Sequence, residues 1–170
     1  TREPGGSSGA EEIRALVLNG DANRWSAETE ILLFTAARRD HLERCIRPAL
    51  DVGKIVICDR FADSTRMYQG LSRGDLRGQV DALHEIMIGL EPDLTLLVDM
   101  DPAQGLHRAT TRGQEDSRFE GFGLDLQSKM RAGFLALAQE FTHRFMTIDG
   151  SGSPDEVAAR IQSVVADRMT

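Results

Sequence analysis

The sequence predicts an α/β fold, a doubly wound parallel sheet with helices on both faces. Short runs that are continuously apolar, such as residues 55–58 and 93–98, alternate with longer segments whose apolar residues recur at helical spacing. Continuous apolar character is typical of strands buried on both faces, and helices between such strands indicate right-handed crossovers. Ligands of these sheets bind beyond the carboxyl ends of the strands, so the residues after each strand are candidates for a site.

The sequence pattern predicts three helices in the first half of the chain. One is expected from Ser8, where Glu11 three residues later would complete a capping box. A second covers residues 26–50 and would be bent or shortened near its end by Pro48. A third covers residues 75–90, where apolar residues follow the helical period.

The second half continues the alternation. The expected strands of the whole chain are residues 55–58, 93–98 and 145–148, and the later helices are residues 102–112, residues 124–141 and a last helix after Ser153. The last helix has the clearest start, with Ser153 at the N-cap, Pro154 at the first helical position and Glu156 at the third.

The composition is that of one globular domain without a surface for polyanions. The chain has 170 residues, 41% of them hydrophobic, and a net charge of −7. Because nucleic acids and membrane surfaces attract positive charge, neither is expected as a partner. No apolar stretch approaches the roughly 18 residues of a membrane span. Cys45 and Cys58 cannot form a disulfide framework, so a cytoplasmic location is expected.

Acidic residues follow each predicted strand. Asp59 and Arg60 come directly after the first strand, whereas Asp99, Asp101 and Asp149 follow the other two. Asp is common where a strand turns into a loop, and we expect those three to be structural. A fixed carboxylate beside a fixed guanidinium suits a magnesium phosphate, because the acid holds the metal or its waters and the guanidinium binds phosphate oxygens. A structural ion pair remains the alternative for Asp59 and Arg60.

A polar, Gly-punctuated segment at about 111–121 is a candidate lid. Arg112 and Arg118 lie in this segment, between two predicted helices. Mobile Arg residues that close over phosphates recur in phosphoryl transfer. For each Arg taken alone, a solvated surface position is the simpler interpretation.

The usual phosphate cradles do not occur in the sequence. Neither G-x-x-x-x-G-K-[ST] nor G-x-G-x-x-G is present. The Gly-rich turn at residues 149–156 lacks the phosphate-binding Lys, and its Ser-Pro-Asp-Glu run is explained as a helix cap. The four His show no metal-ligand spacing, so no zinc site is expected.

Five motifs occur in order along nearly the whole chain. They are TREPGG at 1–6, LF with AAR at 33–38, DRF with Ser64 and YQG at 59–70, PDLT at 92–95, and RG with RFE at 112–120. Together they resemble the bacterial type of thymidylate kinase. The resemblance implies a P-loop nucleoside-monophosphate-kinase fold with a five-stranded parallel sheet. It also implies transfer of the γ-phosphoryl group of MgATP to dTMP, giving dTDP and ADP in dTTP biosynthesis, by a homodimer.

The resemblance assigns the acceptor site by position. The residues implied to bind dTMP are Arg2, Phe34, Arg38, Arg60, Ser64, Thr65, Tyr68 and Gln69. Phe34 would stack on thymine, Arg38 would hydrogen-bond its carbonyl edge and Tyr68 would pack under the deoxyribose. Arg2 and Arg60 would bind the acceptor phosphate. Without the motif, Phe34 would be assigned to the core.

The donor side and the transfer step are implied in the same way. The residues implied to act in catalysis are Asp59, Arg60, Arg112 and Arg118, and those implied to bind ATP are Arg108, Arg112, Asp149 and Gly150. Asp59 would order Mg²⁺ or its waters, and Glu120 would approach the metal.

The family opens with a strand, the P-loop, a helix and a second strand. We expect this segment to occupy about 35–45 residues before Thr1, and residues 1–170 to be a single domain that lacks it. Two alternatives stay open on the sequence. One is a P-loop kinase with another deoxynucleotide or deoxynucleoside acceptor, and the other is a non-catalytic nucleotide-binding module if the P-loop is truly absent.

Overall fold

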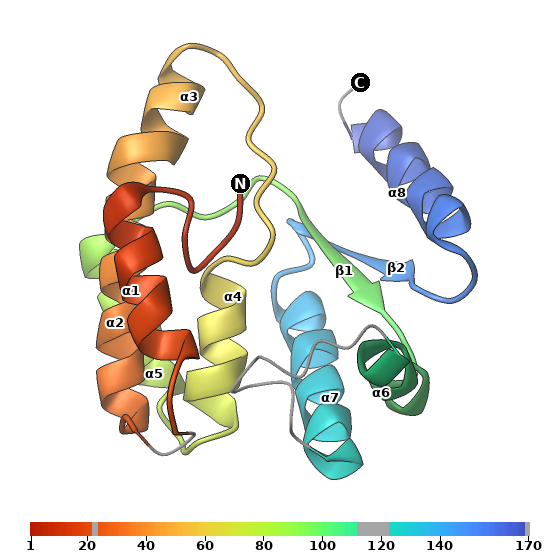
Figure 1. The fold of residues 1–170 in the computed structure, drawn as a ribbon. Helices are drawn as coiled ribbons and strands as arrows, with labels where there is room; N and C mark the ends of the chain where they lie inside the picture. The colour runs from red at the N-terminus through yellow and green to blue at the C-terminus, as the bar shows by residue number, and fades with distance from the viewer. Residues whose placement is uncertain (22–23, 112–122, 169–170) are drawn as a thin grey trace. The chain divides into compact units, whose positions relative to one another are not determined.

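The computed structural model describes residues 1–21, 24–111 and 123–168. The described residues form two compact units, a first unit of residues 1–91 and a second unit that begins at Pro92 (Figure 1). Each unit has its own elements and is described by itself. The expected single domain over residues 1–170 stays a prediction.

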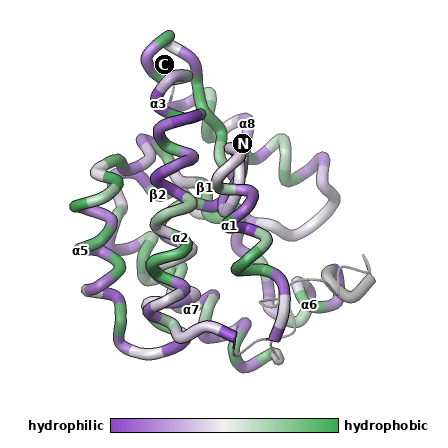
Figure 2. The backbone as a smooth tube through the Cα atoms, turned by 60° about the vertical axis from the view of Figure 1, so that its left-hand side comes forward, coloured by the Kyte–Doolittle hydropathy of each residue, from purple (hydrophilic) through white to green (hydrophobic). Residues whose placement is uncertain are grey.

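The first unit is helical. Its elements are α1 (Ser8–Leu18), α2 (Ala27–His41), the π-helical turn η1 (Leu42–Ile46), α3 (Arg47–Asp51), α4 (Ala62–Thr65), the π-helical turn η2 (Arg66–Leu71) and α5 (Arg77–Met87). Helix α1 packs along α2, and α2 also contacts α5 and η2. Figure 2 shows hydrophilic and hydrophobic residues alternating along α5, as expected for a helix with one buried face.

One hydrophobic core cluster of this unit lies between η1 and the end of α5. Leu42, Ile46 and Ile88 are buried together, and Val56 and Phe61 pack against them. Full burial of each such side chain contributes about 1.5–3 kcal/mol relative to exposure. This cluster therefore ties the long helix to the segment that leads into α4.

The predicted long helix continues through Pro48. Helices α2, η1 and α3 follow one another without a break, and the N–H of Arg47 bonds to the carbonyl of Leu42, the spacing of a π-helix. Pro48 has no N–H to donate to the carbonyl one turn before it, and a widened turn just ahead of a proline accommodates this loss. The helix consequently continues past Pro48 and ends at Asp51.

The predicted capping box of the first helix is wrong. Ser7 is the N-cap, and its hydroxyl donates to Asp40 at 2.7 Å. Glu11 instead accepts from the N–H of Gly6 at 3.0 Å and from the guanidinium of Arg2. A loop that folds back over the helix start has replaced the local partner that the sequence pattern indicated.

The apolar run at residues 55–58 is not the buried strand that the sequence predicted. Within the described residues of the first unit its backbone partner is the segment 1–3: the Thr1 amine donates to Ile57 at 2.8 Å and the Glu3 N–H to Asp59 at 2.9 Å. Ile55 and Ile57 are 71% and 81% exposed. This pairing is one isolated parallel bridge, Arg2 to Asp59.

The second unit is an α/β unit with a parallel sheet. Its elements are β1 (Thr95–Asp99), α6 (Pro102–Thr111), α7 (Leu124–Glu140), β2 (Phe145–Asp149) and α8 (Pro154–Arg168). Strands β1 and β2 are parallel, in a register that runs from Thr95 opposite Phe145 to Asp99 opposite Asp149. Helix α7 packs against both strands and α8 against β2, on opposite sides of the sheet in Figure 1.

These elements confirm the α/β class and the parallel pairing. The described residues contain a two-stranded sheet, and five strands remain a prediction. The predicted start of the last helix is confirmed, since Ser153 Oγ accepts from the N–H of Glu156 and Glu156 accepts from the N–H of Ser153. No helix in the described part of the chain is long and apolar enough to cross a membrane.

The turn after β2 requires a glycine. A Cβ on Gly150 would lie 2.8 Å from the carbonyl oxygen of Asp99 and 2.9 Å from Val98 Cγ1. We expect Gly150→Ala to lower the free energy of unfolding by about 1–3 kcal/mol, because backbone cannot move aside as a flexible side chain can. Urea unfolding measures the change.

The matched control is Gly105→Ala, in helix α6 of the same unit. Outside its own helix backbone, the added Cβ would lie 3.9 Å from Met100 Sδ, which is an ordinary contact. This change should be neutral or stabilise by up to about 1 kcal/mol. Equal unfolding midpoints for Gly150→Ala and the parent protein would contradict the close approach.

Candidate functional site

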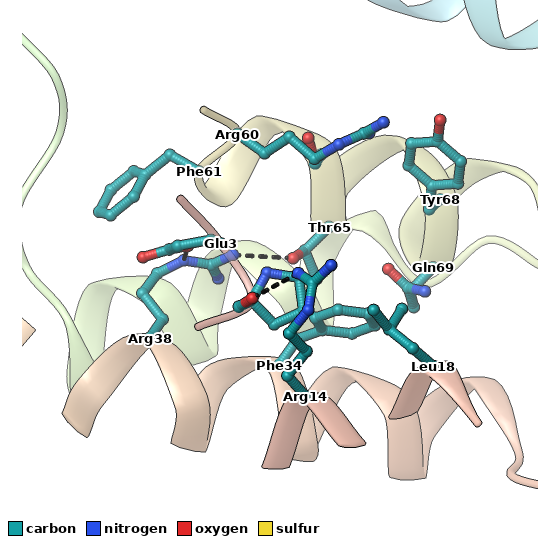
Figure 3. Close-up of a pocket in the computed structure, with 12 residues that line it drawn as sticks. Glu3, Arg14, Leu18, Phe34, Arg38, Arg60, Phe61, Thr65, Tyr68 and Gln69 are labelled. Carbon is teal, nitrogen blue, oxygen red and sulfur yellow. Dashed lines mark hydrogen bonds and ion pairs between the residues drawn. The ribbon is translucent and has the colours of Figure 1, made fainter. Parts of the chain in front are cut away.

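A pocket of about 150 Å³ lies in the first unit (Figure 3). Seven of its lining residues are ones that the resemblance assigned to dTMP: Phe34, Arg38, Arg60, Ser64, Thr65, Tyr68 and Gln69. The other lining residues are Glu3, Pro4, Arg14, Leu18 and Phe61. Residues from the N-terminal loop, α1, α2 and the α4–η2 segment therefore meet at one site.

Helix α2 and the α4–η2 segment each supply several of the residues that line the pocket. Phe34 and Arg38 are one turn apart on α2 and so lie on the same face of that helix. Ser64, Thr65 and Tyr68 come from α4 and η2. No helix is predicted at residues 62–71 from the sequence, because the segment is short and its start at Phe61 has no side-chain cap.

Arg60 enters the pocket from a strained backbone. Its φ is 68°, in the left-handed region, which costs a non-glycine residue roughly 1–2 kcal/mol. Its guanidinium lies over the ring of Tyr68, with Cζ 5.4 Å from the ring centroid. Strain of this kind persists where the surrounding structure fixes it, and it is common at functional sites.

Arg38 is buried and held at two of its nitrogens. Its Nε donates to Glu3 at 2.7 Å and its Nη2 donates to Thr65 Oγ1 at 3.0 Å. Its guanidinium also lies over the ring of Phe61, at 5.2 Å. Among the described residues Nη1 has no hydrogen-bond partner, which leaves this atom available to a ligand in the pocket.

Gln69 is fixed by a buried acid. Its Nε2 donates to Glu30 at 3.0 Å, and Glu30 also accepts from Arg73 at 2.6 Å. Glu30 is fully buried, and such a carboxylate is stable only when it is paired and hydrogen-bonded. Gln69 therefore forms a fixed wall of the pocket.

The α4–η2 segment is anchored by Arg66, which the sequence analysis missed. Its guanidinium donates to Asp63 at 2.8 Å, to Asp81 at 2.7 Å and to Glu91 at 2.6 Å. His84 Nε2 lies 3.1 Å from the same Glu91 carboxylate. Burial alone would raise the pKa of Glu91, but the contacts with His84 and Arg66 lower it to about 2. Of these partners, only Asp63 is close enough in sequence, three residues before Arg66, for the ion pair to be predicted from helical spacing.

Arg2 and Asp59 lie outside the residues that line the pocket. The Arg2 guanidinium pairs with Glu11 at 3.1 Å, and its backbone forms the bridge to Asp59. The N–H of Gly6 and the charge of Arg2 lower the pKa of Glu11. The phosphate role of Arg2 and the metal role of Asp59 stay predictions.

The described residues that are expected to bind ATP, Arg108, Asp149 and Gly150, lie together in the second unit. Arg108 donates to the carbonyl of Gly150 at 3.3 Å and to that of Gly152 at 2.8 Å. Asp149 accepts from the N–H of Ser151 at 2.9 Å, and this hydrogen bond lowers its pKa. Arg108 is thus attached to the turn that follows β2.

Two of the strand-end acids are structural, as expected. Asp99 forms a bidentate ion pair with Arg131, at 2.6 and 2.8 Å, which lowers the pKa of Asp99. Asp101 Oδ1 accepts from the N–H groups of Ala103 and Gln104 at the start of α6. Arg112, Arg118, Glu120 and the lid at about 111–121 lie outside the described residues, apart from the helical end of α6.

Two further polar residues of the pocket were missed by the sequence analysis. Arg14 donates to the carbonyl of Pro4 at 2.7 Å and lines the pocket from α1. Glu3 is buried, and its partners are Arg38 and His41. The only sequence signal was the place of Glu3 inside the TREPGG motif.

Glu3, His41 and Cys58 bring three potential metal ligand atoms within 4.8 Å of one another. The carboxylate is already paired with Arg38 at 2.7 Å and lies 3.0 Å from His41. Burial, followed by the charge of Glu3, raises the pKa of the Cys58 thiol to about 12. A protonated thiol and a committed carboxylate are poor metal ligands, so the cluster fits a hydrogen-bonded group better than a metal centre.

The second unit has the parallel strand pairing of an α/β protein, and the pocket of the first unit is lined by aromatic rings and guanidinium groups. Comparison with known proteins makes this specific. The family model described as thymidylate kinase matches residues 1–161. The chain belongs to the thymidylate kinase family.

Individual relatives agree with the family match. The chain is 71% identical to the thymidylate kinase of Ruegeria pomeroyi over 99% of its own length and 80% of that protein. It is 61% identical to that of Jannaschia sp., over 99% and 81%. The crystal structure of thymidylate kinase from Ehrlichia chaffeensis matches with a TM-score of 0.76 and 29% identity, covering 96% of this chain and 79% of that one.

The raised pKa of Cys58 predicts slow alkylation in the folded protein. At pH 8 a thiol of pKa about 12 has roughly one part in ten thousand as thiolate, the reactive form. Labelling by iodoacetamide, followed by peptide mass spectrometry, should therefore be about a thousandfold slower at Cys58 than for a free thiol. In urea the rate should rise to the free-thiol value. Labelling of the folded protein at that rate would refute the half-buried environment of Cys58 beside Glu3.

Proposed function

We propose that this protein transfers the γ-phosphoryl group of MgATP to dTMP, giving dTDP and ADP, in dTTP biosynthesis. The observation that carries the proposal is the pocket of the first unit, because every residue expected to bind dTMP except Arg2 lines it. The membership of the chain in the thymidylate kinase family supports the same reaction.

The base would be held by one aromatic face and one charged edge. Phe34 is half-buried and lines the pocket on the same helical face as Arg38. A ring in this position would stack on thymine, while Arg38 Nη1 would donate to a base carbonyl. Tyr68 would pack under the deoxyribose, where a ribose 2′-hydroxyl would be disfavoured. A pocket that buries such donors discriminates against bases that cannot accept from them.

Arg60 would bind the acceptor phosphate and neutralise charge as the phosphoryl group passes. Its guanidinium is exposed at the pocket and lies over Tyr68, and its backbone is fixed at positive φ. A pre-positioned guanidinium needs little reorganisation when charge develops on the phosphate oxygens. Arg2, Arg112 and Arg118 are proposed to add phosphate contacts.

Asp59 is proposed to hold Mg²⁺ or its waters, with Glu120 nearby. The Asp59 carboxylate is exposed, directly before Arg60, and oxygen donors of this kind suit Mg²⁺. When bound with ATP, Mg²⁺ neutralises charge on the phosphates. Arg108 and the turn at Asp149 and Gly150 are proposed to flank the adenine.

We propose a homodimer that works in the cytoplasm. Leu32 on α2 and Ile86 on α5 are 57% and 73% exposed, and these two helices contact each other. Large apolar side chains on neighbouring helices are typical of a surface that another chain covers.

The reaction is tested on the protein expressed from its gene. ADP release is followed in a coupled spectrophotometric assay with dTMP, dUMP, dGMP and thymidine as acceptors. We expect the highest kcat/KM for dTMP, because the pocket supplies both base and phosphate contacts. A preference for thymidine would indicate a nucleoside kinase, and binding of dTMP without ADP release would indicate a non-catalytic module; either result would refute the proposal.

Replacement of Arg60 should affect turnover more than stability. We expect Arg60→Ala to lower kcat with dTMP by roughly a thousandfold or more, the scale on which a phosphate-stabilising Arg acts. Alanine inherits the same left-handed backbone, so the urea midpoint should change little. Arg44→Ala is the control, because Arg44 is 76% exposed and does not line the pocket. Turnover of Arg60→Ala within a few-fold of the parent protein would rule out the role.

A further inference from the structure

A chain of hydrogen bonds starts at Arg38, one of the residues that line the pocket. Arg38 Nε donates to Glu3 Oε2 at 2.7 Å. The other oxygen of Glu3 lies 3.0 Å from His41 Nδ1, and His41 Nε2 lies 2.7 Å from Thr1 Oγ1. The tautomer that satisfies both contacts of His41 carries its hydrogen on Nδ1. We call Glu3, His41 and Thr1 the relay.

The relay is buried where it meets Arg38. Arg38, Glu3 and His41 are 4%, 5% and 0% exposed. Removing one partner of a buried ion pair leaves an uncompensated charge, so neither Arg38 nor Glu3 can leave without a large penalty. The guanidinium is therefore confined to one orientation, in contrast to a surface Arg with many rotamers.

The N-terminal loop is shaped around this relay. It supplies Thr1 and Glu3, and it turns at Gly6, where φ is +87°. A Cβ on Gly6 would lie 2.4 Å from His41 Nε2 and 2.5 Å from Thr1 Oγ1. Since only a glycine leaves this space, the loop conformation and the relay require each other.

We propose that Glu3 and His41 are positioning residues for base recognition, which present Arg38 Nη1 to the carbonyl that distinguishes thymine from 5-methylcytosine. The inference rests on the proposed function. Glu3 sets the direction of the guanidinium, Thr65 fixes its second nitrogen, and Nη1 remains for the ligand. His41 holds Glu3 in the orientation that this geometry needs.

The chain offers a matched control made of the same residue types. Arg66, Glu91 and His84 also form an Arg–Glu–His group, with Arg66 Nη2 2.6 Å from Glu91 and His84 Nε2 3.1 Å from it. None of these three lines the pocket. A variant of Glu91 should therefore reduce stability without changing the choice between acceptor bases.

The experiment compares dTMP with 5-methyl-dCMP, which carries an amino group in place of one base carbonyl. For Glu3→Gln we expect kcat/KM for dTMP to fall by about 30-fold, mainly through KM for dTMP, with KM for ATP unchanged. The preference for dTMP over 5-methyl-dCMP should shrink by about tenfold, because a misdirected donor no longer rejects the amino group. Glu91→Gln should lower the urea midpoint and leave this preference as it is in the parent protein.

A second pair of variants covers the case in which Glu3→Gln does not fold. His41→Asn keeps a hydrogen-bond donor near the Nδ1 position and should retain the preference for dTMP over 5-methyl-dCMP. His41→Leu removes this donor and should reduce that preference by about threefold. Circular dichroism verifies that each variant is folded. Equal losses for both acceptors, with the preference unchanged in Glu3→Gln or in His41→Leu, would overturn the inference. If the parent protein itself fails to phosphorylate dTMP, the proposed function fails and not the relay alone.

Discussion

The buried ion pair between Glu3 and Arg38 is the interaction on which the first unit depends. It joins the N-terminal loop to α2, and Arg38 extends the connection to Thr65 on α4. Three segments far apart in the sequence therefore share one charge-paired centre. A net-acidic protein can accept an anionic ligand only where cations are concentrated, and the pocket is lined by three guanidinium groups, those of Arg14, Arg38 and Arg60.

Buried charges are also paired behind the residues that line the pocket. Arg66, next to Thr65 in sequence, is buried among three carboxylates, and Glu30 is buried between Gln69 and Arg73. Each of these two buried charges has a partner of opposite sign, and removing one partner would cost more than the pair gains. The ligand thus meets side chains whose orientations are set before it arrives, which lowers the entropic cost of binding.

Local sequence patterns predicted local structure, whereas the residues of the site are brought together by contacts between segments that are far apart in the sequence. The start of α8 was predictable because Ser153 and Glu156 are partners within one turn. The role of Glu11 was not, since its partners come from a loop that folds back. The predicted buried strand at residues 55–58 was wrong, because the pairing of its backbone depends on a segment far away in the sequence, residues 1–3. Phe34 and Arg38 were predicted from the resemblance alone, and the contact of Glu3 with His41 spans 38 positions and leaves no periodic signal.

The left-handed backbone of Arg60 sets stability and chemistry against each other at one position. Glycine would relax that conformation, and asparagine tolerates it better than most residues, yet neither carries a positive charge. Selection for thermal stability alone would therefore move this position away from arginine, and the gain would come at the expense of phosphate binding. A protein of this family stabilised by random mutagenesis should be screened for turnover at the same time.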